Sequence, residues 1–246
     1  MSTLLTTLFA SIVGESEENS DILDLYAHNM KQYLLLNQEL ISRAQHLSPT
    51  ADLSILLKKM RSSLLHGLQQ TNLVLLTQRD RSNRLEVHPV IVEANELIRQ
   101  IIDEYSPLFE VAEIALHLDL SECNVNVALD PAIFPSVIIN LLDNAIKYSK
   151  PGGSVSISSK TRESVLVIEI SDNGIGIPEE DRELIFSKHF RSENTSHVSG
   201  SGLGLYMAKK IVLAHNGAIK LEKTNKFITT FCIELPIAGS TSKRED

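Results

Sequence analysis

Two asparagines and a lysine recur at helical spacing in the stretch 131–149, which reads PAIFPSVIINLLDNAIKYS. Asn140, Asn144 and Lys147 are separated by four and three residues, so they share one face of a helix. Asparagine carbonyl oxygens are hard, neutral ligands that suit a Mg2+ ion bridging phosphate oxygens, and a lysine ammonium is a point charge for a phosphate. The stretch therefore predicts a metal and phosphate site on a helix. The alternative is an amphipathic helix with two solvated or capping amides.

Two glycine-rich segments suit the same kind of ligand. The first, 171–178, reads SDNGIGIP and leaves an apolar strand. Its alternate glycines allow the backbone to approach a flat ligand closely, and Asp172 can accept a hydrogen bond from an exocyclic amine such as that of adenine. The second, 200–205, reads GSGLGL and opens a helix, where backbone N–H groups and the helix dipole favour a phosphate. Taken singly, each is also compatible with an ordinary turn or surface loop.

In this order the three segments resemble the N, G1 and G2 boxes of the GHKL ATP-binding fold, and the likeness is greatest to the catalytic domain of sensor histidine kinases. It covers roughly residues 85–236 and implies that ATP and Mg2+ bind there. The residues that the resemblance implies are Asn140 and Asn144 for Mg2+; Lys147 for phosphate; Tyr148, Asp172, Gly174, Gly176 and Ile177 around adenine; and Ser201, Gly202, Leu203, Gly204 and Leu205 at the triphosphate. The segment between the last two boxes, about 179–199, resembles a mobile lid, with Phe186 and Phe190 as candidate anchors.

The elements that must position these residues can be predicted from hydrophobic periodicity. Strands are expected at 85–92, 114–120, 125–129, 155–158, 165–170, 218–222 and 227–235, with helices at 93–105, 131–149 and 202–215. Such a mixture predicts an α+β fold class, here a two-layer α/β sandwich of the GHKL (Bergerat) type. The expected domains are an extension at 1–20, a helical hairpin at 21–80, the ATP-binding domain at 85–236 and a disordered tail at 237–246.

The hairpin is predicted from two amphipathic helices, at about 21–47 and from Ser48-Pro49 to about 79. One antiparallel hairpin leaves apolar faces uncovered, and a homodimer that forms a four-helix bundle would cover them. The sequence LYAHNMKQYL at 25–34 resembles the phosphoacceptor box of the histidine kinase dimerisation domain. On a helical wheel His28 lies on the polar face, and an exposed imidazole is a workable nucleophile. Lys31 fits the motif, but Asn29 replaces its usual acid and Tyr33 its usual proline.

The resemblance implies a two-component histidine kinase, which autophosphorylates His28 and transfers the phosphoryl group to an aspartate of a response regulator receiver domain. His28, Gln32 and Lys147 are the predicted catalytic residues, with Gln32 a candidate for orienting water in dephosphorylation of the partner. Because Asn29 cannot act as a base, the alternative is an ATP-binding pseudokinase or phosphatase-type signalling partner. A GHKL ATPase machine or serine-directed kinase is a third class. For His28 alone, an ordinary surface histidine is the alternative.

The charge, apolar runs and cysteines of the chain restrict the kinds of partner and compartment that are expected. The net charge of -8 and the lack of a long basic run argue against nucleic acid and against an anionic membrane surface. No apolar run reaches membrane-spanning length, so no membrane segment is expected in this chain. Cys123 and Cys232 are isolated, which suits a reducing, cytoplasmic compartment. If the chain is complete, it has no room for a sizeable sensor domain, and a separate sensory partner is then expected.

Overall fold

The protein, seen here as a computed structural model, divides into two compact units, Met1–Arg81 and Ser82–Asp246. The structure describes residues 85–120, 125–193, 200–222 and 229–239, and in the first unit only scattered positions between 36 and 77. Those scattered positions are all helical. Most of the predicted hairpin, including His28, Asn29 and Gln32, lies outside the described residues. The whole predicted extension at 1–20 and residues 240–246 of the predicted tail lie outside them as well.

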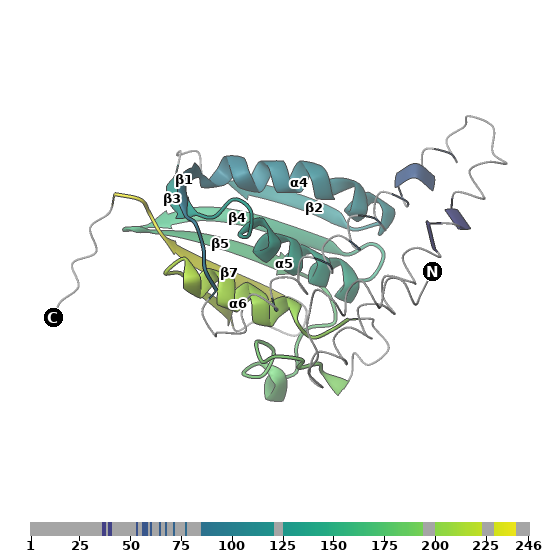
Figure 1. Cartoon of the computed structure of the whole chain (residues 1–246). Coiled ribbons are helices and arrows are strands. Elements are labelled where there is room, and N and C mark those ends of the chain that lie inside the picture. The colour runs from purple at the N-terminus through teal and green to yellow at the C-terminus, as the bar shows by residue number, and fades with distance from the viewer. Residues whose placement is uncertain are drawn as a thin grey trace, which may run out of the picture. The chain divides into compact units, whose positions relative to one another are not determined.

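The second unit is built on a five-stranded sheet in the order β2-β4-β5-β7-β6 (Figure 1). Only β2 and β4 run parallel, and every other neighbouring pair is antiparallel. A separate antiparallel pair joins β1 to β3. The elements, in chain order, are β1 (Val90–Glu93), α4 (Ala94–Val111), β2 (Ala115–Leu120), β3 (Asn126–Leu129), α5 (Pro135–Tyr148), β4 (Ser154–Arg162), β5 (Val165–Asp172), the 3-10 turn η2 (Glu179–Asp181), α6 (Gly204–Ala214), β6 (Ala218–Glu222) and β7 (Thr229–Pro236).

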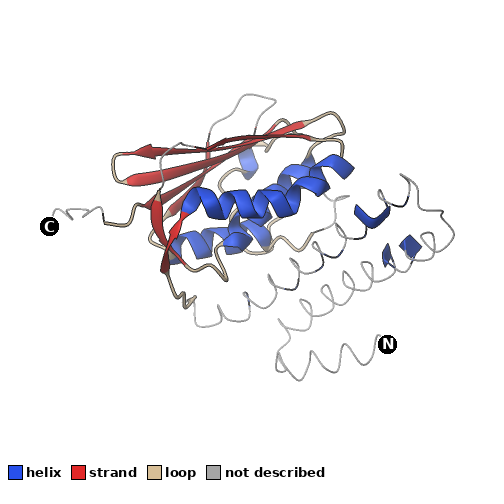
Figure 2. Cartoon of the chain, turned by 90° about the horizontal axis from the view of Figure 1, so that it is seen from above, coloured by secondary structure: helices blue, strands red, loops and turns tan. Residues whose placement is uncertain are grey.

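Helices α4, α5 and α6 cover one face of this sheet, as the view from above shows (Figure 2). On β5, Leu166, Ile168 and Ile170 share a face and are at most 2% exposed. This is the helix-covered face, because Ile170 pairs with Ile157 on β4, and Ser159 two residues on from Ile157 donates its hydroxyl to Asn95 of α4. The core therefore lies between one helical layer and the sheet, which is the two-layer arrangement that the alternation of elements predicts.

Helix α4 is longer than the sequence predicts. It begins after Glu93, whose carboxylate accepts hydrogen bonds from the backbone N–H groups of Asn95 and Glu96, and it continues past Tyr105 through Pro107. A proline inside a helix leaves the carbonyl four residues earlier without its usual donor. Here that carbonyl, on Asp103, accepts the hydroxyl of Ser106 at 3.4 Å, so the helix can continue to Val111.

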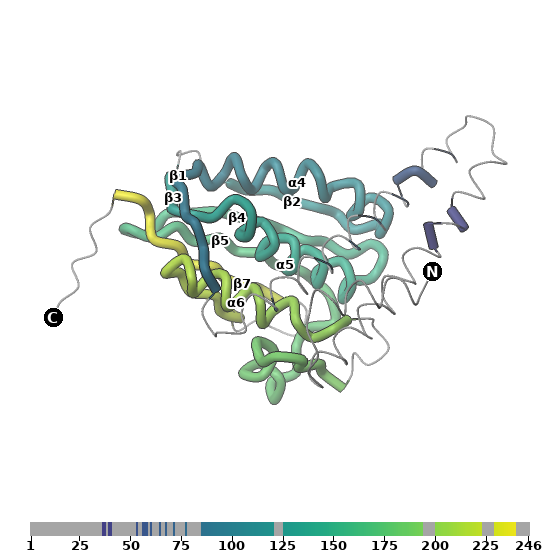
Figure 3. The backbone as a smooth tube through the Cα atoms, viewed as in Figure 1, coloured from purple at the N-terminus to yellow at the C-terminus, as the bar shows by residue number. Residues whose placement is uncertain are grey.

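Helix α5 is shorter than predicted, because residues 131–134 form a turn in front of it. The Asp130 carboxylate accepts the Ala132 N–H at 2.9 Å, and the Asp130 carbonyl accepts the Phe134 N–H at 2.9 Å. The helix then starts at Pro135, where a missing N–H costs no hydrogen bond. The backbone tube in Figure 3 shows α5 lying along the sheet between α4 and α6. Of the three predicted site segments, 131–149 contains this central helix.

Candidate functional site

The end of helix α5 contacts the glycine-rich turn that follows strand β5. The Ile175 N–H donates to the Tyr148 carbonyl at 3.1 Å. A Cβ atom added at Gly174 would lie 2.4 Å from that carbonyl oxygen and 2.8 Å from Oδ1 of Asp172. Real side chains do not approach this closely, so glycine is required for the turn to pack against the helix.

Asp172 lies at the start of this turn and is only 8% exposed. Its Oδ1 accepts the Gly174 N–H at 2.9 Å. Burial raises the pKa of the Asp172 carboxyl, and the hydrogen bonds from the Gly174 backbone and the Thr229 side chain partly offset that rise. The site thus presents a fixed, desolvated carboxyl group, which is suited to reading a single hydrogen-bond donor on a ligand.

Thr229 is a site residue that sequence reasoning missed. It is 5% exposed and pairs directly with Asp172 across strands β7 and β5. Its side chain hydrogen-bonds to the Asp172 carboxyl, so it helps to hold that group in place. The signal that identifies Thr229 is the register between two strands far apart in the sequence, which periodicity within one strand does not reveal.

The same helix α5 contacts the second glycine-rich segment through Asn140. The Asn140 side-chain amide donates to the Gly204 carbonyl at 3.2 Å, and Asn140 is 3% exposed. A Cβ atom at Gly204 would lie 3.4 Å from Oδ1 of Asn140, so the first turn of α6 sits tightly against α5. Helix α5 is therefore the common neighbour of both glycine-rich segments.

Backbone contacts join the segment between the two glycine-rich segments, about 179–199, to the residues in front of α6. Gly202 has a φ of 68°, and a Cβ atom there would lie 2.7 Å from the carbonyl carbon of His189. The His189 N–H donates to the Gly202 carbonyl at 3.1 Å. Both the positive φ and the close approach require glycine, so this position fixes the path of the chain into α6.

Lys147 and Asp143 are one helical turn apart on α5. Asp143 is 7% exposed, and Lys147 is half-buried. Burial lowers the pKa of the Lys147 ammonium, while the negative charge of Asp143 acts in the opposite direction. A partly desolvated cation on this face is suited to an anionic ligand.

Residues 130–239 match the sequence profile of the family described as histidine kinase-, DNA gyrase B-, and HSP90-like ATPase. The chain is 32% identical over 165 residues to the adaptive-response sensory kinase SasA of Synechocystis sp., a match that covers 67% of this chain and 43% of the relative. It is 36% identical over 150 residues to the sensor protein RprX of Bacteroides fragilis, covering 59% of this chain and 29% of the relative. The solved catalytic domain of histidine kinase ThkA superposes with a TM-score of 0.55 at 28% identity, covering 61% of this chain and 96% of that domain.

The matched residues all lie in the C-terminal unit. The predicted resemblance to the ATP-binding domain of sensor histidine kinases, and the predicted GHKL sandwich, are thereby confirmed. The chain spans less than half of the length of the curated relatives named above. None of the helices in the described part of the chain has the length and apolar character needed to cross a lipid bilayer.

Within the ATP-binding domain, the remaining predicted site residues fall into two groups. The half-buried group consists of Asn144, Tyr148, Ile177, Ser201, Leu205 and Gly176. Gly176 also has a positive φ of 74°. Leu203 differs from them, because it is 1% exposed and its side chain belongs to the core. Its carbonyl accepts the Met207 N–H at 2.9 Å, so Leu203 serves the site through its backbone, by setting the first turn of α6.

The described part of the lid-like segment is anchored to the ATP-binding domain by Phe186. Its ring packs edge-to-face against Phe231 of β7, with centroids 6.2 Å apart, and the Lys209 ammonium of α6 lies 5.4 Å from its centroid. The Ser192 hydroxyl also donates to the Asp181 carboxylate. These contacts fix the root of the segment, while residues 194–199 lie outside the described residues.

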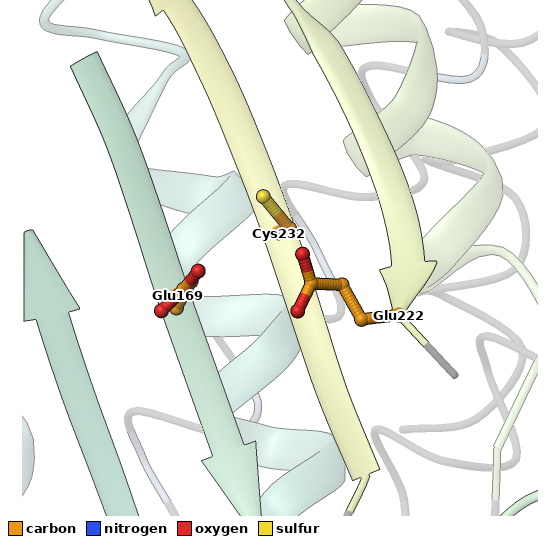
Figure 4. Close-up of side chains that lie close together, drawn as sticks. All are labelled: Glu169, Glu222 and Cys232. Carbon is orange, nitrogen blue, oxygen red and sulfur yellow. The ribbon is translucent and has the colours of Figure 1, made fainter. Parts of the chain in front are cut away.

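A second cluster of polar side chains lies on the sheet face opposite the helices. Glu169 of β5, Glu222 of β6 and Cys232 of β7 gather across three strands (Figure 4), with one ligand-type atom from each within 4.8 Å of the others. Glu169 is already paired with Lys160 at 2.6 Å, and burial raises the pKa of the Cys232 thiol. The cluster is thus a partly neutralised set of cross-strand pairs, and we assign no ligand to it.

Proposed function

We propose that this chain is the catalytic core of a two-component sensor histidine kinase. In this proposal the ATP-binding domain presents ATP to His28 of a dimeric helical hairpin, and the phosphoryl group then passes to an aspartate of a response regulator. The observation that supports it most is the contact of α5 with both glycine-rich segments, at Tyr148–Gly174 and at Asn140–Gly204. These contacts bring the predicted adenine segment to the C-terminal end of α5 and the predicted triphosphate segment to the middle of the same helix.

The ATP-binding residues would act mainly by position and charge. Asp172 would accept the exocyclic amine of adenine, with Thr229 holding the carboxyl, and Lys147 would contact a phosphate. Phosphoryl transfer needs little covalent help from the protein, so placing the phosphates and neutralising their charge supply most of the rate enhancement. The lid-like segment would close over the triphosphate and exclude water.

Of the two asparagines assigned to Mg2+, Asn144 is the one that fits a metal ligand better. It is half-buried and carries a neutral oxygen donor on the same helix as Lys147. Asn140 is 3% exposed and its amide nitrogen is engaged by Gly204, so we assign it chiefly to joining α5 and α6. The sequence-based prediction that Asn140 also binds Mg2+ stays a prediction. When bound, Mg2+ would neutralise charge on the phosphates.

Homodimer formation is supported by apolar side chains in the first unit. Leu36, Leu57 and Leu64 lie at helical positions and are 45%, 53% and 56% exposed in the single chain. Exposed leucines on helices are what a second copy of a helical hairpin would cover. A sedimentation experiment on the full chain should give the mass of a dimer, and a concentration-independent monomer would contradict this part of the proposal.

Incubation with radiolabelled ATP and Mg2+ tests the function directly. The chain should acquire an acid-labile, alkali-stable label, which His28→Gln abolishes. The matched control is His66→Gln, which changes a histidine on the polar side of the second predicted helix and should leave the label in place. Label that survives His28→Gln would assign the phosphoacceptor to another residue.

The second candidate function is that of a pseudokinase or phosphatase-type signalling partner with a slow or absent autokinase reaction. It is favoured by Asn29, which replaces the usual acid of the phosphoacceptor box. General base assistance is typically worth about 100- to 10,000-fold in rate, and an amide cannot supply it. Restoring the acid with Asn29→Glu should therefore accelerate labelling of His28 if the chain is a kinase. Tight ATP binding with no label in either form would identify a pseudokinase or phosphatase-type partner. In the latter, Gln32→Ala should abolish dephosphorylation of the response regulator.

A further inference from the structure

Asp130 is a buried residue that joins separate parts of the ATP-binding domain, and the function proposed above gives it no role. It lies between strand β3 and the turn in front of helix α5, and it is 3% exposed. Its Oδ2 accepts the His88 N–H at 2.8 Å, and its Oδ1 accepts the Ala132 N–H at 2.9 Å. Burial acts to raise the pKa of this carboxyl, but the two backbone hydrogen bonds and the nearby imidazoles of His88 and His215 outweigh burial, so the pKa is lowered. The ionised carboxylate is therefore held by donors from two segments.

The backbone of Asp130 is also bonded to the C-terminal end of helix α6. The Asp130 N–H donates to Nε2 of His215 at 2.9 Å, and His215 is 4% exposed. Nδ1 of the same ring lies 2.7 Å from the Ile211 carbonyl, which can only accept a hydrogen bond. The ring thus donates through Nδ1 and accepts through Nε2. Its position is fixed further by the Phe134 ring, which packs edge-to-face against it with centroids 5.4 Å apart.

Two hydrogen bonds, one at each end of α6, set the placement of this helix against α5. The Asp130–His215 bond joins the residues in front of α5 to the C-terminal end of α6. The Asn140–Gly204 bond joins the middle of α5 to the N-terminal end of α6. Since the predicted triphosphate segment leads into α6 and Lys147 lies on α5, this placement sets how the phosphate-binding groups face one another.

The third part that Asp130 holds is the segment 85–89, which enters strand β1 soon after the start of the C-terminal unit at Ser82. His88 and Pro89 are exposed, so the His88 N–H connects an exposed segment to a buried carboxylate. Displacement of this segment would leave Oδ2 of Asp130 buried without that donor, which is costly for an ionised group. The carboxylate would have to move toward water, and the turn in front of α5 would move with it.

We propose, on the basis of the function proposed above, that Asp130 is a positioning residue for nucleotide binding that couples the segment 85–89 to helices α5 and α6. With His88 bonded to Asp130, the two helices are placed to bind the nucleotide tightly. With the segment displaced, the affinity is lower. Because such coupling is reciprocal, a bound nucleotide in turn holds the segment in place. An event in the chain ahead of β1 that displaces this segment would therefore release the nucleotide.

Removal of the His88 N–H tests the coupling. Proline at position 88 has no N–H, and the following Pro89 already favours at position 88 the extended backbone that proline itself adopts. In calorimetric titrations of the full chain, His88→Pro should bind ADP at least about fivefold more weakly than the wild type. The matched control is His88→Ala, which keeps the backbone N–H and should bind ADP as tightly as the wild type. Urea unfolding of each variant establishes that it is folded under the conditions of the titration.

Hydrogen exchange measured by NMR tests the reciprocal effect in the wild type, without a substitution. Saturating ADP should slow exchange of the His88 amide by about the factor by which His88→Pro weakens ADP binding. The control amide is that of Ile114, which bonds to the Phe109 carbonyl beyond the end of α4 and should not change. A double-mutant cycle tests the route through Asp130: in an Asp130→Asn background, His88→Pro should weaken ADP binding markedly less.

Unchanged ADP affinity in a folded His88→Pro would overturn the coupling, because a purely structural bond would lower the free energy of unfolding alone. Equal weakening by His88→Ala would also overturn it, since the side chain and not the N–H would then be responsible. If His88→Pro does not fold, the exchange measurement decides, and a His88 amide that ADP does not protect refutes the coupling. A wild type that binds no ADP would refute the proposed function itself, whereas ADP binding without these changes would refute the coupling alone.

Discussion

Substitution of Gly174 by alanine should disrupt the contact between helix α5 and the turn after β5. The added Cβ atom would lie 2.4 Å from the Tyr148 carbonyl oxygen and 2.9 Å from its carbonyl carbon. Both are backbone atoms, so the clash cannot be relieved by rotating a side chain. The turn must move, and the hydrogen bonds Ile175 N–H to Tyr148 O and Gly174 N–H to Asp172 Oδ1 would be lengthened or lost.

The expected loss in free energy of unfolding can be estimated from these contacts. Overpacking against a well-packed site costs roughly 1–3 kcal/mol, and each weakened hydrogen bond adds about 1 kcal/mol. The free energy of unfolding of the C-terminal unit should therefore fall by roughly 3–5 kcal/mol, which corresponds to a drop in Tm of about 6–20 °C for a domain of this size. Because Asp172 moves with the turn, ATP affinity should fall by at least about tenfold.

Differential scanning calorimetry and ATP titration of Gly174→Ala measure the two effects. The matched control is Gly200→Ala, since a Cβ atom at Gly200 meets nothing within 4 Å. This control should change Tm by no more than about 2 °C, as expected for a substitution that makes no new contacts. If Gly174→Ala melts like Gly200→Ala and binds ATP like the wild type, the proposed contact between α5 and the turn is wrong.

Three other substitutions test the energetics of the domain. Asp172→Asn should abolish ATP binding but raise the free energy of unfolding at pH 7. The reason is that burial raises the pKa of the Asp172 carboxyl, so its ionised form is unfavourable in the folded protein. In urea titrations this gain in stability should decrease as the pH falls through the folded pKa and should vanish below the unfolded value of 3.8. His215→Ala should lower the free energy of unfolding by about 3 kcal/mol in the same titrations, since His215 is 4% exposed and its Nε2 accepts the buried Asp130 N–H at 2.9 Å. Lys160→Ala should change it by less than about 1 kcal/mol, as the side chain of Lys160 is 43% exposed in its pair with Glu169. A larger loss from Lys160→Ala than from His215→Ala would contradict this ranking.

The order of helices and strands in the ATP-binding domain could be predicted from the sequence, because each element carries its own hydrophobic period. The exact ends of helices α4 and α5 could not be predicted, because they depend on local hydrogen bonds that the hydrophobic pattern does not reveal. Pro107 does not end α4, since Ser106 satisfies the carbonyl that the proline leaves free, and the Asp130 turn delays the start of α5 to Pro135.

The candidate site was predictable to the extent that its residues lie in recognisable segments. Asp172, Gly174 and Gly204 could be chosen from glycine spacing, but Thr229 could not, because its place depends on the register of β7 against β5. The burial of Asn140 was also not predictable, since the spacing that puts it on one face with Lys147 does not reveal how closely α6 packs there. The roles of His28 and Gln32 remain sequence-based predictions.

The most direct test of the central claim is a calorimetric titration of the full chain with ATP and Mg2+, compared with the same titration of Asp172→Asn. If α5 and the two glycine-rich segments form one nucleotide site, the wild type should show saturable binding at one ATP per chain, and Asp172→Asn should show none. A wild type without saturable heat, or a variant that binds ATP as tightly as the wild type, would contradict the account.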